Sequence, residues 1–186
     1  VSDGSTSTSD TFVLTVNALN DAPTISNIVA ASTNEDTAFT SPTITVGDVE
    51  TAAASLTMSG TSSNTALVAN TSITFGGSGA SRTVTCTPVG NATGTSTITV
   101  TVSDGSASTS KTFVLTVNAL NDAPTITDIA NQSISEDGAT SALPFTIGDV
   151  ETSTTTLTVT ATSSNTTLVP NTSTNLTLGG SGASRT

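Results

Sequence analysis

The chain has 186 residues, of which fourteen are acidic, three are basic and none is histidine, so that its formal net charge is −11. This balance argues against nucleic-acid binding, because phosphate contacts need clustered Lys and Arg, and it equally disfavours an anionic membrane surface. No apolar run approaches the roughly 18 residues of a membrane span, so we expect no membrane insertion in this segment. The length allows one large domain or two small ones.

The first 22 residues are predicted to be the final strand and linker of a preceding repeat. TFVLTV at 11–16 alternates apolar residues with Thr, the pattern of a strand with one buried face. We expect Phe12, Leu14 and Val16 to insert between two sheets, contributing about 1.5 to 3 kcal/mol each. The segment NALNDAPT then leads the chain into the next domain. The same fourteen letters, TFVLTVNALNDAPT, return at residues 112–125.

Residues 23–122 are predicted to form one complete unit of about a hundred residues, because an offset of 101 relates many of their motifs to later copies. Short stretches with period two follow one another, including TITV, LTM and TITVTV, separated by turn formers such as SSN and PVGNATG. About seven short strands without a helical period favour an all-β fold over disorder, namely a β-sandwich of immunoglobulin-like topology. The only cysteine, Cys86, is expected to be a small core residue.

Residues 123–186 are predicted to be an incomplete copy that lacks the counterparts of the last strands. More chain or a neighbouring copy would then supply the missing strands. The segment GGSGASRT, present in both copies, lacks the ending of a phosphate-binding loop and is predicted to be a Gly-rich hairpin. We expect Arg82 and Arg185, at its end, to pair with a carboxylate.

Recurring acidic motifs connect these strands: NDAP at the junction, SDG before the last strand, NEDT and SEDG near the first, and GDVET further on. In this order they resemble the bacterial cadherin-like and immunoglobulin-like tandem repeats of very large surface proteins and adhesins. The resemblance covers essentially the whole chain. It implies tandem immunoglobulin/cadherin-like β-sandwiches, about 100 residues each and arranged head to tail as a rod outside the cell. Neighbouring repeats would be its partners, and calcium often stiffens each junction.

The resemblance also implies calcium ligands at matching positions. The linker would contribute Asn and Asp, the first loop Glu, and two later turns Asp and Glu: Asn20, Asp21, Asn121, Asp122, Glu35, Glu136, Asp48, Glu50, Asp149, Glu151, Asp3 and Asp104. The Asp-Arg-Glu motif of cadherins has no counterpart here, so we expect one or two Ca²⁺ ions per junction.

The residues themselves support a cation independently. Carboxylates that converge at one pole of a sandwich repel one another by roughly 3 to 4 kcal/mol per pair at an effective dielectric near 20, and a cation reverses that sign. Calcium prefers such hard oxygen donors, whereas zinc would require His or Cys. The alternative is that these Asp and Asn residues are ordinary turn formers, with the Glu35 segment a solvated loop.

The predicted function is that of a structural extracellular spacer repeat in a bacterial surface protein or adhesin. The absence of His and of any nucleophile beside a candidate base argues against an enzyme. One alternative is a filament subunit, completed by strands from a neighbouring copy. Another is a glycan- or protein-binding adhesion module, although aromatic residues that stack on sugars are nearly absent and the five Phe residues mostly fit core positions: Phe12, Phe39, Phe75, Phe113 and Phe145.

Overall fold

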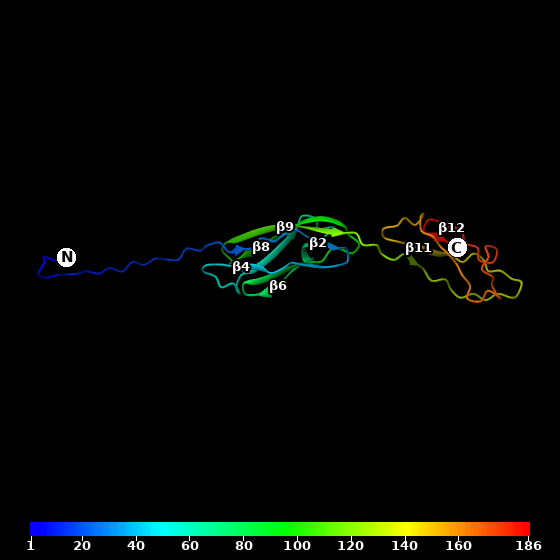
Figure 1. Cartoon of the computed structure of the whole chain (residues 1–186), viewed down its shortest axis with the longest axis horizontal. Helices are drawn as coiled ribbons and strands as arrows, with labels where there is room; N and C mark the ends of the chain where they lie inside the picture. The colour runs from blue at the N-terminus through cyan, green and yellow to red at the C-terminus, as the bar shows by residue number, and fades with distance from the viewer. The chain divides into compact units, whose positions relative to one another are not determined.

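The computed structural model describes all 186 residues and is built of β-strands apart from one short 3-10 helix, Asn70–Ser72. It confirms the predicted all-β class. The chain forms two compact units, Val1–Asn118 and Ala119–Thr186, so the division falls four residues before the predicted end of the first complete repeat (Figure 1). That residues 1–22 belong to a preceding repeat stays a prediction.

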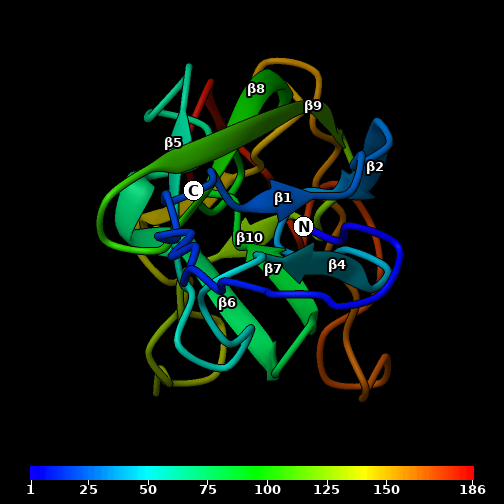
Figure 2. The same ribbon diagram turned by 90° about the vertical axis from the view of Figure 1, so that its left-hand side faces the viewer.

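The first unit contains two sheets that face each other. One sheet has the order β1-β4-β7-β3, with β6 also paired to β7: Thr24–Ile25 (β1), Phe39–Thr40 (β3), Ile44–Gly47 (β4), Ile73–Ser78 (β6) and Ser81–Cys86 (β7). The other has the order β2-β9-β8-β5: Ala31–Asn34 (β2), Thr57–Ser62 (β5), Gly94–Ser103 (β8) and Ser108–Asn118 (β9). In the view of Figure 2, β1 lies beside β4 and β8 beside β9.

One strand pair in the first unit differs from all the others. β2 runs parallel to β9, with Ala31 opposite Leu115 and Asn34 opposite Asn118, whereas every other pair is antiparallel. β9 also pairs with β8, to which a short turn joins it, so β9 has a neighbouring strand on each side. The strand is therefore interior to its sheet.

The core of the first unit follows directly from the alternation of apolar residues with Thr. In β8, Ile98, Val100 and Val102 are completely buried, whereas the Thr residues between them point outward. Side chains from the facing sheet complete the core, among them Val84 and the thiol of Cys86, both completely buried. Cys86 is thus a core residue, as predicted.

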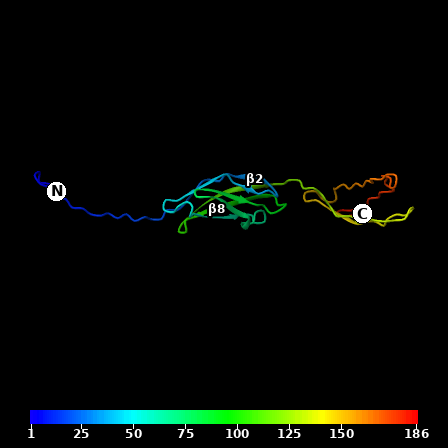
Figure 3. The same ribbon diagram turned by 90° about the horizontal axis from the view of Figure 1, so that it is seen from below.

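The first copy of TFVLTV does not form a strand. Residues 9–22 lie outside every sheet and run as an extended stretch, seen in Figures 1 and 3. The exposed fractions of Phe12, Leu14 and Val16 are 88%, 77% and 83%. The expectation that these side chains are buried, Phe12 among the core positions, is therefore wrong for this chain. The physical reason is that no neighbouring strand or facing sheet lies beside them.

The second unit contains one sheet in the order β10-β11-β13-β12: Thr125–Ile126 (β10), Phe145–Gly148 (β11), Gly180–Ser181 (β12) and Ser184–Arg185 (β13). Its first pairing repeats that of the first unit, because Thr125 lies opposite Gly148 as Thr24 lies opposite Gly47. Phe145 and Ile147 are buried within this sheet.

GGSGASRT forms the predicted Gly-rich hairpin in both units, β6–β7 and β12–β13. Gly77 has a φ of +85° and a Cβ there would collide with the Ser81 carbonyl, which explains the need for glycine. The Arg82 guanidinium does not pair with a carboxylate. It donates to the main-chain carbonyls of Gly79 at 2.9 Å and Ala53 at 3.0 Å. Arg185 likewise donates to the Thr154 carbonyl at 3.0 Å, so both predicted ion pairs are replaced by loop-anchoring bonds.

Candidate metal centre

Three segments of the first unit meet where the chain enters the sandwich. The linker amide of Asn20 donates to Asp104 Oδ2 at 3.0 Å, and the backbone N–H of Asp21 donates to Glu50 Oε2 at 3.1 Å. Asp104 belongs to the turn between β8 and β9, and Glu50 to the segment after β4. We call this group the entry pole and define it as Asn20, Asp21, Asp48, Glu50 and Asp104.

Side-chain hydrogen bonds to nearby backbone N–H groups close the two acidic turns of the entry pole. Asp48 Oδ1 accepts the backbone N–H groups of Glu50 at 3.0 Å and Thr51 at 2.7 Å. Asp104 Oδ1 accepts those of Ser106 and Ala107, both at 2.6 Å. Asp side chains often close turns in this way, so the turn-forming role considered from the sequence is fulfilled. It uses one oxygen of each carboxylate and leaves the other for a different partner.

The second oxygen of Asp48 is buried and has no hydrogen-bond partner. A buried carboxylate oxygen without a donor or a cation is costly, and it is the kind of group that a bound cation would satisfy. The neighbouring donors are carboxylate, amide and main-chain oxygens, which match calcium. No three Asp, Glu, His or Cys side chains are grouped closely enough to hold a metal by themselves. An ion here would therefore combine the Asp48 and Glu50 carboxylates with oxygens of the linker.

The second unit reproduces this arrangement around its own linker. The N–H of Asp122 donates to Glu151 Oε2 at 3.0 Å, as that of Asp21 does to Glu50. Asp149 Oδ1 accepts the backbone N–H groups of Glu151 at 3.1 Å and Thr152 at 2.6 Å. Asn121 donates its side-chain amide to the Asp122 carbonyl at 2.7 Å. Four of the predicted ligands are thus brought together within the second unit.

The two SDG aspartates have similar turns and different surroundings. The pKa of Asp104 lies below its ordinary value of 3.8, first because of the hydrogen bond from the Ala107 N–H and then because of that from the Asn20 amide. The pKa of Asp3 is lowered first by the Thr6 N–H and then by the Ser5 N–H. The hydrogen bonds of Asp3 are all within its own turn, with Ser5 and Thr6. Only Asp104 joins the entry pole.

Glu35 lies at the other end of the sandwich, which we call the exit pole. Its backbone N–H donates to the Asn118 carbonyl at 2.9 Å, and its side chain is 2% exposed. β9 runs from the Asp104 turn to Asn118 over eleven residues, about 33 Å at 3.3 Å per residue. Glu35 therefore does not converge with Asp48 and Glu50. Its counterpart Glu136 lies in an exposed turn of the second unit.

Asp36 makes a contact at the exit pole that sequence reasoning did not assign. Its Oδ1 accepts the backbone N–H of Asn91 at 3.1 Å. Both residues have a φ of +58°, a conformation that Asp and Asn tolerate better than most side chains. The signal in the sequence was the identity of these two residues in turn-rich segments.

Solved structures with a similar chain path include proteins of unrelated roles. A chimeric titin Z1Z2 carrying a decorin peptide is 16% identical with a TM-score of 0.41, and covers 55% of this chain and 100% of its own. Titin domains Z1Z2 in complex with telethonin are 15% identical with a TM-score of 0.42, covering 73% and 68%. An endo-fucoidan hydrolase of glycoside hydrolase family 107 is 22% identical with a TM-score of 0.39, covering 56% of this chain and 15% of its own. Likenesses this weak carry no information on function.

No curated protein matches the sequence. The profile of the family described as "Bacterial Ig domain" matches residues 20–118. The match begins at Asn20 in the entry pole and ends at Asn118, the last residue of β9, and it covers more than half of the chain. The resemblance to bacterial immunoglobulin-like repeats is thereby confirmed, and the chain belongs to the bacterial Ig domain family.

Proposed function

We propose that this chain is a structural spacer from a bacterial surface protein or adhesin, acting outside the cell, in which calcium stiffens the linkers that lead into successive domains. The observation that supports this proposal is the entry pole. There the linker residues Asn20 and Asp21 are hydrogen-bonded to the acidic turns of the domain they precede, beside an unpaired buried oxygen of Asp48.

The path of the chain through the first unit suits a spacer. The chain enters at the Asp104 turn and leaves at Asn118, at the opposite end of the eleven-residue strand β9. A domain that admits the chain at one pole and releases it at the other adds its whole length to an array. Nothing in this role requires a catalytic group, and the family to which the chain belongs is one of Ig domains.

Calcium would supply a positive charge that the entry pole lacks. Asp48 and Glu50 would hold the ion with oxygens of Asn20 and Asp21, and the same roles would fall to Asp149, Glu151, Asn121 and Asp122 in the second unit. Binding would fix the direction in which the linker enters the sandwich, because linker and turn would coordinate the same ion. Extracellular calcium modules bind at about 10⁻⁴ to 10⁻³ M, so the sites would be filled outside a cell and mostly empty within.

Thermal denaturation in a calcium titration tests the proposal. A ligand at ten times its Kd adds about 1.4 kcal/mol to the free energy of unfolding, so millimolar calcium should raise the melting temperature of the first unit and EDTA should reverse the rise. Asp48→Asn should remove the effect. Asp10→Asn is the matched control, because Asp10 is an exposed carboxylate that accepts a hydrogen bond from the neighbouring Thr11 N–H and lies outside the entry pole.

The result that contradicts the calcium role is equally clear. A melting temperature that does not respond to calcium or EDTA, or responds equally in the Asp48→Asn and Asp10→Asn proteins, removes the ion from the proposed function. Small-angle scattering of the whole chain provides an independent measurement, because a stiffened linker should narrow the distribution of distances between the two units when calcium is added.

A further inference from the structure

The strand β5 forms one edge of the sandwich in the first unit, because it is the last strand of the sheet β2-β9-β8-β5. The Ser63 N–H donates to the Thr97 carbonyl at 2.9 Å and continues the antiparallel pairing of β5 with β8. Hydrogen-bonding groups alternate along an antiparallel strand. The main-chain groups of the odd-numbered residues in 57–61 therefore face β8, and those of the even-numbered residues in 56–62 face away from it, along a free edge.

Side chains close both ends of this free edge. At one end, Asn70 Oδ1 accepts the Ser62 N–H at 2.8 Å. At the other end, the Arg82 guanidinium donates to the Leu56 carbonyl at 3.5 Å. Both main-chain groups are therefore already bonded within the domain and are not available to a further strand.

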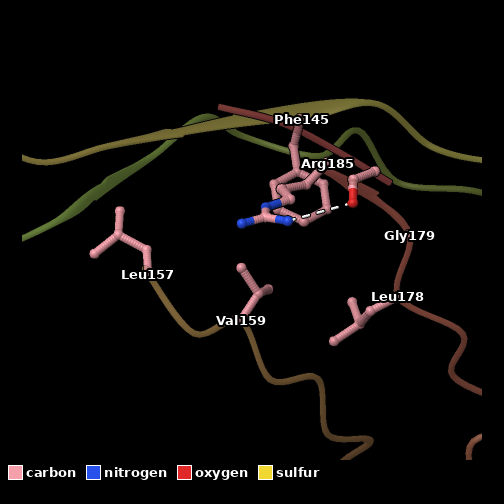
Figure 4. A pocket seen from close by; sticks show the side chains of 7 residues that line it. Phe145, Leu157, Val159, Leu178, Gly179 and Arg185 are labelled. Carbon is pink, nitrogen blue, oxygen red and sulfur yellow. Dashed lines mark hydrogen bonds between the residues drawn. The ribbon is translucent and has the colours of Figure 1, made fainter. Parts of the chain in front are cut away.

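The same kinds of bond recur at the corresponding positions of the second unit. There the Ser163 N–H donates to Asn171 Oδ1 at 2.6 Å, and Arg185 donates to the Thr154 carbonyl at 3.0 Å. Figure 4 shows the further bond from Arg185 to the Gly180 carbonyl, at 3.3 Å. The Asn and Arg contacts are thus a property of the repeat and not of one copy.

The stretch between the two closures is open. No hydrogen bond reaches the N–H and C=O groups of Met58 and Gly60. The strand has the sequence TMSGTS and an unbroken register with β8, so it has no charged residue, no proline and no bulge. These are the features that protect sheet edges from pairing with another chain. Two residues of β5 can therefore accept a further strand.

We propose that β5 of one copy of this chain pairs antiparallel with β5 of a second copy, across a twofold axis at Ser59. Met58 of each copy then lies opposite Gly60 of the other, and the two pairs form four main-chain hydrogen bonds. A slide of two residues either way would need the Leu56 carbonyl or the Ser62 N–H, which are already bonded. The closures therefore select this register.

The outward side chains of β5 favour a second copy as the occupant. Thr57, Ser59 and Thr61 are exposed. In this register Ser59 lies opposite Ser59 of the second copy and Thr57 lies opposite Thr61, as closely spaced pairs whose hydroxyls can bond each other. The chain has a net charge of −11, but neither β5 nor its neighbour β8 contains a charged residue. Two copies can therefore meet along this edge without opposed like charges.

This pairing goes beyond the spacer function, because it joins two spacers side by side. It uses none of the entry-pole residues, so its test is independent of calcium. The same patch serves on both copies, and the contact closes as a dimer of domains. A single contact of this size is weak, whereas several such domains along two neighbouring chains would hold each other through many contacts at once.

Disulfide trapping in the whole chain tests the pairing and its register. Ser59→Cys should form a covalent homodimer under mild oxidation, because directly opposed Cα atoms of such a pair are about 4.5 Å apart, within disulfide reach. Thr57→Cys and Thr61→Cys should each cross-link about tenfold more slowly alone, because four residues of extended strand then separate the two thiols, and readily when mixed. The native Cys86 is buried and does not compete. A monomeric Ser59→Cys protein, or equal rates for all three proteins alone, overturns the proposal.

Charge substitution at Ser59 tests the association without a covalent bond. Ser59→Asp should weaken association about tenfold or more, because two carboxylates then lie directly opposite each other. Ser59→Lys should act alike, and an equimolar mixture of the two proteins should associate again. Thr112→Asp is the matched control, because Thr112 is exposed on the interior strand β9, and it should associate as the unchanged chain does.

Light scattering from low micromolar to millimolar concentration measures these associations. A monomer at every concentration overturns the pairing between copies and leaves the open edge to an extended segment of a different protein. Equal effects of Ser59→Asp and Thr112→Asp, or no recovery in the mixture of the Asp and Lys proteins, overturn it as well.

Discussion

The two copies of TFVLTV have the same sequence and opposite environments. Leu115 is completely buried in β9, whereas Leu14 is 77% exposed; Phe113 is 3% exposed and Phe12 is 88%. The difference lies in the neighbours, because β9 is flanked by β8 and β2 and covered by the facing sheet, and residues 11–16 have none of these. An alternating apolar segment therefore supplies the capacity to form a strand, and the partners decide whether it does.

The two copies of NDAP behave in the opposite way. Asp21 and Asp122 donate to Glu50 and Glu151 at 3.1 and 3.0 Å, and the Thr that follows each linker bonds the carbonyl of Gly47 or Gly148 at 3.0 and 3.1 Å. The bonds between the linker and the acidic turn after β4 or β11 recur in both units, although the cores differ and the Asn20–Asp104 bond is found only in the first unit. These shared contacts join each linker to residues that follow it by 23 to 29 positions.

The largest difference between the copies should appear in core truncation. Leu115→Ala should lower the free energy of unfolding of the first unit by about 2 to 5 kcal/mol, through lost burial and the cavity left behind. Leu14→Ala changes an exposed side chain and should stay within about 0.5 kcal/mol. Urea denaturation of the two proteins measures both values. Comparable losses at the two positions would mean that residues 11–16 are packed in solution.

The Cys86 thiol offers an independent measure of the same comparison. Burial raises its pKa to about 11, so the native thiol should react slowly across the neutral range and should be labelled through unfolding of the first unit. Leu115→Ala should accelerate labelling about thirtyfold or more, since every 1.4 kcal/mol is tenfold. Leu14→Ala should leave the rate unchanged. Fast labelling of the unaltered protein in the absence of denaturant would contradict the buried position of β7.

Removing the Glu50 carboxylate, which accepts a hydrogen bond from the linker, should have a smaller effect on stability. Glu50→Ala takes away the bond from the Asp21 N–H and should cost about 0.5 to 1 kcal/mol, the lower part of the range for single hydrogen bonds, because the site is exposed. Glu50→Gln retains an acceptor oxygen and should cost less. Hydrogen exchange at the Asp21 amide reports the loss directly, and Glu151→Ala should accelerate exchange at Asp122 alone. Acceleration at both amides by either substitution would mean that the two linkers are coupled.

The smallest predicted effect distinguishes the two SDG turns. A lowered pKa in the folded state means that the stabilisation by Asp104 is complete above its ordinary value of 3.8 and is lost as pH falls through the folded-state pKa. Asn20→Ala removes the second of its hydrogen-bonding causes and should raise the pKa of Asp104 toward 3.8 without changing that of Asp3. Carboxyl titration by NMR compares both groups in one sample. An unchanged Asp104 would show that the Asn20 contact is absent in solution.

Sequence reasoning was most successful where structure is local. Period-two alternation predicted the all-β class and the buried face of β8, and Gly-rich composition predicted the hairpins. All five residues of the entry pole were among the ligands that the family resemblance implied, because the linker and turn motifs recur together; that they bind a metal stays a prediction. The separation of Glu35 could not be read from motif order, since the length of β9 sets it. The burial of Phe12 depends on partner strands, and the hydrogen-bond partners of Arg82 depend on carbonyls in a distant loop.

The parallel pairing of β2 with β9 has a mechanical consequence. The chain enters the first unit at one pole and leaves β9 at the other, so tension between Asn20 and Asn118 pulls β2 backward and β9 forward along their common direction. The four opposed residue pairs are then loaded in shear and must yield together, whereas an antiparallel hairpin pulled from one end would unzip one pair at a time. A domain connected in this way should therefore resist stretching most strongly along the axis from its entry pole to its exit pole.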